Sequence, residues 1–188
     1  MHGERTDEAL MLAYRDGDAP AFETLYRRYR GRLYRYLVHQ CGNPATAEEL
    51  YQDIWLKVVN ARQGYEVAAK FSTWLFRIAH NRLMDHFRSH ARASLVAYEL
   101  DEDDDPIDPP AAESGQPERM LERKAMAQAL VDGMAALPAP QRETFVLAQE
   151  GEMTLEEIAN ATGVSRETAK SRLRYALNKL RQRLRDLK

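Results

Sequence analysis

The sequence predicts an all-α protein made of two small helical domains joined by a flexible acidic linker. Apolar residues recur with helical spacing in both halves of the chain, and no segment shows the alternation of a β-strand. The charge is also divided: residues 1–95 carry a net charge of +3 and residues 119–188 a net charge of +4, whereas residues 96–118 carry −9. We therefore expect a first domain at 1–95, a linker at 96–118 and a second domain at 119–188.

Composition excludes several classes of protein. The 188 residues suffice for one ordinary domain or two small ones. The mean hydropathy of −0.60 and the lack of a long apolar run argue against a membrane span, and the first ten residues show no apolar core of a signal peptide. The single cysteine, Cys41, cannot form an internal disulfide. We expect a cytoplasmic protein rather than a secreted or membrane-bound one.

The linker prediction rests on composition. Residues 96–118 include nine acidic residues, four prolines and no basic residue. Such a segment repels itself and buries too little apolar surface to offset the entropy that ordering would cost. A flexible, extended connection is therefore expected.

Capping residues define the expected helices of the first domain. Thr6 and Asp18 are N-cap residues for the first two helices, and Gly17 and Gly42 end them. The second helix keeps its apolar residues at i, i+3, i+4 and i+7 along most of its length. The expected helices span about 6–17, 18–41, 45–61 and 72–92, with a loop at 63–70 between the last two.

The second domain carries the strongest local motif. Thr154 and Glu157 form a predicted capping box, and Ala159 and Gly163 stand where a helix-turn-helix needs a small residue and a turn. The following helix has an apolar side and an opposite side of short polar and basic residues, which suits a DNA major groove. The alternative is a helical hairpin with a solvated charged face. The expected helices span about 118–136, 140–147, 154–161 and 165–187.

The third helix has apolar residues on two sides. Leu56 falls opposite the core stripe, with Trp55 near it and Glu48 and Glu49 beside it. An exposed apolar strip rimmed by acids indicates a docking surface for another protein. The alternative is a helix buried on more than one side. The predicted core stripe consists of Ala47, Leu50, Ile54, Val58 and Ala61, and the other residues near Leu56 are Gln52 and Val59.

Aromatic residues concentrate around the predicted loop and the start of the fourth helix, from Tyr65 to Phe76, and basic residues continue along that helix. Rings that stack on bases and cations that bind phosphates are what single-stranded nucleic acid requires. The alternative is that rings such as Trp74 and Phe76 belong to the core.

No constellation of catalytic residues is evident. The sequence has no glycine-rich phosphate loop, no nucleophile elbow and no paired carboxylates in an apolar setting. His86 and His90 have i, i+4 spacing, but no third metal ligand stands at a recognised spacing, and Asp101–Asp105 lacks the pattern of a calcium loop. We expect no enzymatic activity, no metal, no cofactor and no small-molecule substrate.

Together these features resemble the extracytoplasmic-function (ECF) sigma factors, the small two-domain members of the sigma-70 family of bacterial RNA polymerase. The resemblance extends from Asp7 to about Leu184, and its motifs occur in the family's order. In the first domain they are DAPAFETLYRRY at 18–29, AEELYQDIWLK at 47–57 and FSTWLFRIAHNR at 71–82. In the second domain they are LPAPQRETF at 137–145, EEIA at 156–159 and TAKSRLR at 168–174.

The resemblance implies three functional surfaces and their partners. Residues expected to contact core RNA polymerase, through its beta and beta-prime subunits, are Glu48, Glu49, Gln52, Asp53 and Leu56. Residues expected to open and bind the minus-ten promoter element are Tyr65, Lys70, Phe71, Trp74, Arg77 and Asn81. Residues expected to read the minus-thirty-five element as duplex DNA are Arg166, Thr168, Lys170, Ser171, Arg172 and Arg174. An inhibitory anti-sigma protein is a further implied partner.

One position departs from the family pattern. Thr46 stands where many relatives have an Asp, so the docking rim has one acid fewer. A function of a different class also fits part of the sequence: an autonomous regulator that binds operator DNA through the helix-turn-helix without polymerase. That alternative leaves the aromatic loop and the exposed strip of the third helix unexplained.

Overall fold

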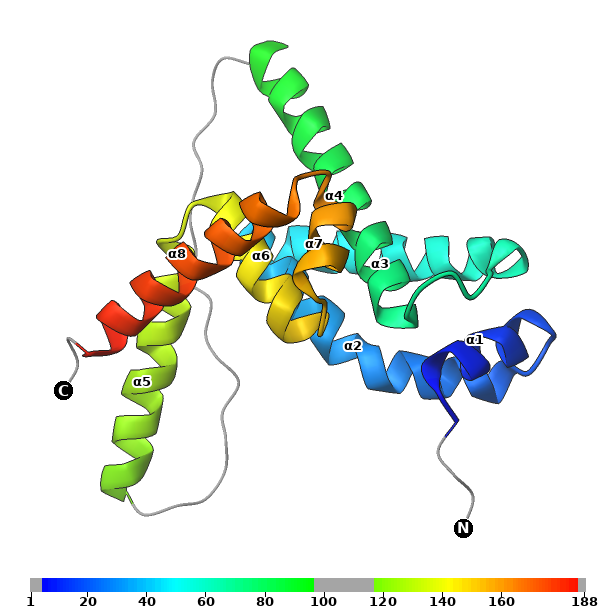
Figure 1. Cartoon of the computed structure of the whole chain (residues 1–188), viewed down its shortest axis with the longest axis horizontal. Helices are drawn as coiled ribbons and strands as arrows, with labels where there is room; N and C mark the ends of the chain where they lie inside the picture. The colour runs from blue at the N-terminus through cyan, green and yellow to red at the C-terminus, as the bar shows by residue number, and fades with distance from the viewer. Residues whose placement is uncertain (1–4, 97–116, 186–188) are drawn as a thin grey trace.

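A computed structural model describes residues 5–96 and 117–185 of the chain (Figure 1). Within these ranges every regular element is helical, which confirms the predicted all-α class. The first domain contains α1 (Asp7–Arg15), α2 (Ala19–Cys41), α3 (Pro44–Ala61), a 3-10 turn (Arg62–Gly64) and α4 (Phe71–Val96). The second contains α5 (Pro117–Ala135), α6 (Ala139–Glu150), α7 (Leu155–Thr162) and α8 (Arg166–Arg185). The predicted acidic linker lies outside the described residues except at its two ends, which belong to α4 and α5.

Side-chain caps start α1, α2 and α7, as predicted. The Thr6 hydroxyl accepts a hydrogen bond from a backbone N–H of α1, Asp18 does the same for α2, and the Thr154–Glu157 capping box of α7 is complete. Two helices are longer than expected, since α4 reaches Val96 and α6 reaches Glu150. Neither glycine nor proline interrupts these helices beyond their expected ends, so nothing stops them there.

Aromatic rings dominate the interior of the first domain. Tyr36, Phe71 and Phe76 are fully buried, and the rings of Tyr36 and Phe76 meet edge to face with 5.5 Å between centroids. α2 is the central helix, in contact with α1, α3 and α4. Asp7 ties α1 to α2 because its carboxylate accepts hydrogen bonds from Arg28 and Tyr29. This interior holds α3 and α4 in fixed positions.

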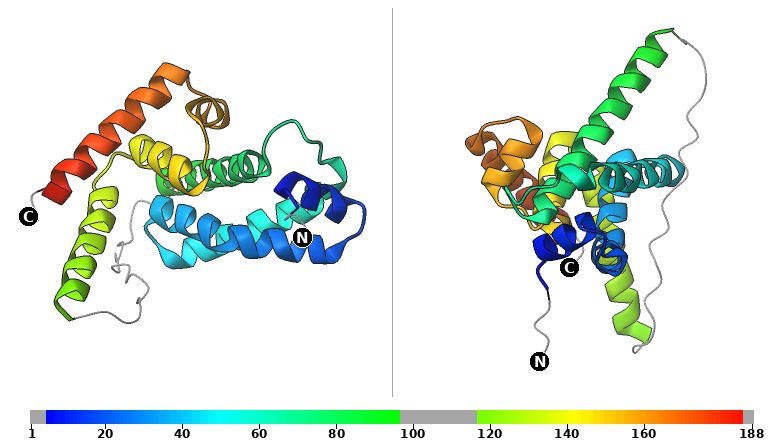
Figure 2. Two further views of the ribbon diagram at one scale, coloured as in Figure 1. Left: turned by 60° about the horizontal axis from the view of Figure 1, so that its bottom comes forward. Right: turned by 90° about the vertical axis from the view of Figure 1, so that its right-hand side faces the viewer.

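α8 is the central helix of the second domain, where it packs against α5, α6 and α7 (Figure 2). Its buried residues Ala169, Ala176 and Leu180 belong to the predicted apolar side. A Cβ at Gly133 of α5 would meet the Leu180 side chain at 3.0 Å, so α5 and α8 approach closely there. The opposite side of α8 remains open to solvent.

The two domains touch along a seam in which polar pairs accompany a continuous cluster of buried apolar residues. α6 lies against α2, and α7 lies against α4 (Figures 1 and 2). The interdomain seam consists of Arg32, Arg35, Tyr36, Lys70, Thr73 and His80 of the first domain with Glu143, Glu150, Glu152 and Glu157 of the second. The cations and hydroxyl donors come from the first domain and the carboxylates from the second. The sequence predicted a tether between the domains but not this contact.

Candidate nucleic-acid and partner interfaces

The exposed face of α3 places a leucine among polar and acidic side chains. Leu56 is 59% exposed. Glu48 and Gln52 precede it in steps of four residues and are exposed, as is Glu49. Gln52 Nε2 donates to Glu48 Oε1 at 3.2 Å. An exposed leucine on such a stripe is a surface that another protein can cover.

Two residues of α3 do not lie where the periodicity predicts. Trp55, expected near the exposed strip, is only 7% exposed because its ring packs against Phe22 and Tyr26 of α2. Ala61, expected in the core stripe, is exposed because it lines an open cavity beside α4. α3 is therefore buried on more of its circumference than the core stripe alone indicates, while Leu56 keeps its predicted exposure.

Asp53 is engaged within the first domain. Its Oδ2 accepts hydrogen bonds from Arg82 Nε at 2.9 Å and from Arg82 Nη2 at 2.6 Å. A carboxylate held by two guanidinium N–H groups is fixed in orientation. Asp53 thus joins α3 to α4 at the edge of the face that Leu56 occupies.

The aromatic residues around the loop before α4 are mostly interior. Tyr65 and Phe71 are 2% and 0% exposed, whereas Trp74 is half-buried. The Tyr65 ring lies edge-on to Trp74 with 5.0 Å between centroids. The Tyr65 hydroxyl has no hydrogen-bond partner among the described residues, and burial, with Glu8 and Asp7 nearby, raises the pKa of Tyr65 to about 12. In this conformation Trp74 is the one predicted ring that reaches the surface.

A cavity of about 440 Å³ lies between α3 and α4, next to this loop. Of the predicted site residues, Asn81 lines the cavity, while Lys70 and Arg77 are exposed on the loop and on α4. The cavity is shallow and open to solvent, and the two asparagine amides at its edge offer both donors and acceptors. The complete lining is Lys57, Asn60, Ala61, Ile78 and Asn81.

α7 and α8 form a helix-turn-helix. Gly163 has a φ of 69°, in the left-handed region that glycine adopts most readily, and it turns the chain between the two helices. The Val164 N–H donates to the Ala159 carbonyl at 3.0 Å, and Ser165 Oγ caps α8 by accepting from the Thr168 N–H at 3.1 Å. The predicted motif is present with its turn and both caps.

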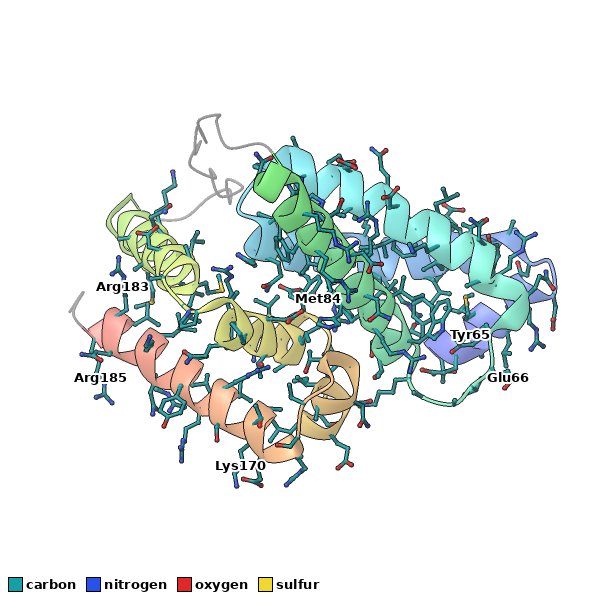
Figure 3. The ribbon with its side chains drawn as sticks, turned by 90° about the horizontal axis from the view of Figure 1, so that it is seen from above. Tyr65, Glu66, Met84, Lys170, Arg183 and Arg185 are labelled. Atoms are coloured by element: carbon teal, nitrogen blue, oxygen red, sulfur yellow. The ribbon has the colours of Figure 1, made fainter. Side chains whose placement is uncertain are left out.

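The outer side of α8 is basic and faces away from the first domain, as the position of Lys170 shows (Figure 3). The Arg174 guanidinium lies 5.2 Å from the ring centroid of Tyr175, which is 52% exposed. Among the predicted residues Arg166, Lys170 and Arg174 are exposed, whereas Thr168, Ser171 and Arg172 are half-buried. All six side chains are therefore at least partly exposed to solvent, and all belong to α8.

His86 and His90 of α4 are not joined by a third possible metal ligand among the described residues. His86 and His90 have ring centroids 4.4 Å apart, and the described part of the chain holds no group of three or more metal-ligating residues. Burial, with His90 and Arg82 nearby, lowers the pKa of His86.

Among the described helices none is long and apolar enough to cross a membrane.

Both domains match known families. Residues 25–93 match Sigma-70 region 2, and residues 133–182 match Sigma-70, region 4. The RNA polymerase sigma factor CarQ of Myxococcus xanthus is 31% identical over 177 residues, which cover 94% of this chain and 97% of that protein. The ECF RNA polymerase sigma factor RpoE of Cereibacter sphaeroides is 32% identical over 184 residues, or 96% of this chain and 97% of that protein.

A solved structure supports the fold. The sigma factor RpoE of Bartonella quintana, in complex with the anti-sigma factor NepR, superposes with a TM-score of 0.71. The match covers 87% of this chain and 96% of that chain at 22% sequence identity. At this identity the likeness is one of fold.

Proposed function

Since the chain belongs to the ECF sigma factors of the sigma-70 family, we propose that it binds bacterial core RNA polymerase, directs it to specific promoters and helps to open their DNA. The observation that carries this proposal is the presence of two unrelated surfaces on one chain: the leucine and acids of α3, and the basic helix-turn-helix. An autonomous DNA reader needs only the second. No catalytic step is part of the proposed activity.

The α3 face is the proposed docking site for polymerase. Leu56 supplies the apolar centre, and Glu48, Glu49 and Gln52 supply a polar rim. Protein interfaces concentrate their binding energy in a few central, fully desolvated side chains, whose loss costs about 2 kcal/mol or more. Asp53 would support the face by keeping α3 against α4 through Arg82.

The loop before α4 and the exposed side of α4 are the proposed minus-ten surface. Lys70 and Arg77, which are exposed, would bind phosphates, and the half-buried Trp74 would stack on an unpaired base. Tyr65 and Phe71 would act from the interior by holding the loop in shape. Because the Tyr65 hydroxyl has no hydrogen-bond partner among the described residues, moving that ring outward would break no hydrogen bond with them.

The cavity between α3 and α4 is the proposed site for an extruded base. Opening a duplex costs a few kcal/mol for each base that leaves the stack, and a pocket can offset that cost. Asn60 and Asn81 can hydrogen-bond to a base edge, and Ile78 offers an apolar wall.

α8 is the proposed reader of the minus-thirty-five element. Thr168 and Ser171 are short polar side chains near the helix start, where base edges are reached, and the surrounding arginines and Lys170 suit phosphates or guanine. Binding through these cations is expected to weaken steeply as salt rises.

Two further parts of the proposal concern context. The relative from Bartonella quintana was solved with an anti-sigma factor, and we extend such a partner to this chain, with the α3 face as the surface it would cover. The proposed location is the cytoplasm, where polymerase and promoter DNA are found.

The test is a titration of the fluorescently labelled full chain with bacterial core RNA polymerase. Leu56→Glu is expected to weaken binding by about 30-fold or more, because it places a charge at the centre of the apolar contact. Met126→Glu is the matched control: Met126 is 46% exposed on α5, and its replacement is expected to change the affinity less than twofold.

The outcomes separate function from surface. Tight binding that only Leu56→Glu abolishes supports both the function and the docking face. Tight binding that survives Leu56→Glu keeps the function and refutes the face. No binding to polymerase, together with sequence-specific binding of the chain alone to duplex DNA, would establish the autonomous regulator instead.

A further inference from the structure

Two histidines of α4 face each other at the surface of the first domain. His86 and His90 lie one turn apart on one side of the helix, with 4.4 Å between their ring centroids. His86 is half-buried and His90 is exposed. Within the described part of the chain neither ring has a hydrogen bond or an ion pair. Both imidazoles are therefore available to a ligand from solution.

The separation of the two rings suits two ligands of one metal ion. Imidazole nitrogens bind Zn²⁺ at about 2.0–2.1 Å, so two of them around one ion lie about 3 Å apart. Rings with centroids 4.4 Å apart can bring one nitrogen each to that separation by small side-chain rotations. Histidines at i, i+4 on a helix bind zinc in this way in metalloproteases. Imidazole favours Zn²⁺, Cu²⁺ and Ni²⁺, whereas Mg²⁺ and Ca²⁺ prefer oxygen ligands.

A carboxylate of α3 lies on the same level as the pair. α3 and α4 pack antiparallel, and Asp53 joins them by accepting hydrogen bonds from Arg82. Glu49 precedes Asp53 by one turn, and His86 follows Arg82 by one turn, which brings Glu49 beside His86. The pKa of His86 agrees with this position: burial, with His90 and Arg82 nearby, lowers it, and the Glu49 carboxylate opposes the shift.

Glu49 is the carboxylate whose charge is not already engaged. Asp85, next to the pair on α4, accepts a hydrogen bond from Arg88 Nη2 at 2.6 Å. Glu48 of α3 accepts one from Gln52. Glu49 is exposed and has no hydrogen bond or ion pair with another described residue. Its negative charge is therefore free to attract a cation toward the two imidazoles.

We propose that His86 and His90 bind a divalent transition-metal ion such as Zn²⁺, held beside the Glu49 carboxylate. The described residues assemble no set of three metal ligands, so water would fill the remaining coordination positions. Sequence spacing predicted no metal at this pair, because it does not reveal that Glu49 of another helix lies next to it.

The site adjoins the proposed polymerase-docking face, since Glu49 belongs to its acidic rim. An acidic rim suits a basic partner surface, and a dication bound next to Glu49 offsets that charge. The metal-loaded chain should therefore bind polymerase less tightly than the metal-free chain. This consequence rests on the proposed function, whereas metal binding itself is a property of the chain alone.

The test is a titration of the full chain with Zn²⁺ in competition with a chromophoric chelator, with Cys41 replaced by Ser so that no thiol competes. His86→Gln and His90→Gln are each expected to weaken zinc binding by about tenfold or more, since one imidazole alone forms no chelate. Glu49→Gln should weaken it about threefold. His39→Gln is the matched control: His39 is a half-buried histidine of α2, and its loss should change the affinity less than about twofold.

Absence of zinc binding, or zinc binding that survives both His86→Gln and His90→Gln, would overturn the site. The polymerase titration is then repeated with saturating Zn²⁺, which is expected to weaken docking by about threefold, and His90→Gln should remove this effect. Equal polymerase affinities of the zinc-loaded and metal-free chains would overturn the link to docking. Absence of polymerase binding without zinc would instead count against the proposed function, while the zinc titration still decides whether the site exists.

Discussion

The interior of the first domain and the interdomain seam are both shielded from water, but they differ in chemistry. Leu33, Leu50 and Ile54 have no exposed surface and lie among aromatic rings. Glu143, at the centre of the seam, is buried among hydrogen-bonding groups instead. Separating apolar surfaces exposes them to water at a cost, whereas polar groups exchange one partner for another. The interior of the first domain is therefore apolar throughout, whereas the seam adds buried polar groups to the apolar residues that continue from one domain into the other.

The largest expected effect tests the apolar side of this comparison. Leu50→Ala should destabilise the protein by about 2–5 kcal/mol, because it leaves a cavity in the core of the first domain, on the buried side of α3. Urea denaturation measures this directly. Leu56→Ala, the same change on the same helix at an exposed position, should shift stability by less than about 0.5 kcal/mol. Equal losses in the two variants would show that the exposed leucine is a core residue in solution.

The next expected effect is on the alkylation rate of Cys41, at the end of α2. Burial raises the pKa of Cys41 to about 11 from a usual value of 9.0, although Arg142 of α6 opposes the shift. At pH 8 the thiolate fraction, and with it the rate of alkylation by iodoacetamide, should be about 100-fold below that of a free thiol. Arg35→Glu, which reverses a charge of the interdomain seam, should accelerate the reaction. Alkylation of the unmodified chain at the rate of a free thiol would indicate that the two domains are separated in solution.

Higher salt should weaken the ion pairs of the interdomain seam and leave the interior of the first domain unchanged. Raising ionic strength from about 0.05 M to 0.5 M shortens the range of electrostatic interaction to a few ångströms, so we expect the fraction of chains with separated domains to rise severalfold. Small-angle X-ray scattering should show a larger radius of gyration with unchanged helix content by circular dichroism. Loss of helix in step with the expansion would mean that the domains do not separate as intact units.

The smallest expected effect is a pH dependence. Burial alone would raise the pKa of Glu157, but hydrogen bonds from the Thr154 N–H and the Thr73 hydroxyl, with Lys70 nearby, hold it below its usual 4.5. A depressed carboxyl pKa stabilises the state that contains it at higher pH, and the stabilisation is lost as pH falls below about 4.5. The ratio of joined to separated domains should fall only about twofold from this group, because the bonds to Thr154 persist when the domains separate.

Glu157→Gln checks that assignment. The variant should flatten this component of the pH profile of the radius of gyration while leaving the effects of salt in place. An unchanged profile would place the titrating group at another carboxylate of the seam.

Sequence reasoning succeeded where local chemistry decides the structure. The caps at Thr6, Asp18 and Thr154, and the positive φ of Gly163, depend on residues within one turn of each other. The exposure of Leu56 follows from its place opposite Ala47, Leu50, Ile54 and Val58, a stripe that contacts a neighbouring helix. Periodicity captures such features because each element carries its own signal.

Sequence-based prediction failed where residues far apart in the chain come into contact. Trp55 is buried by rings from α2, and the cavity beside Asn81 exists only between α3 and α4. Aromatic residues before α4 suited stacking on DNA, but sequence spacing does not reveal that Tyr65 and Phe71 point inward. The seam left no periodic signal either. Its trace in the sequence is only the presence of acids in α6 and α7 and of cations along α2.

The unequal distribution of charge across the seam has a consequence for how the second domain meets DNA. Once the domains part, this small domain carries four carboxylates on one side and the arginines of α8 on another. In the field of a duplex the acidic side is repelled and the basic side attracted, which applies a torque before any contact forms. The acids of the seam would then orient the recognition helix toward the groove during approach.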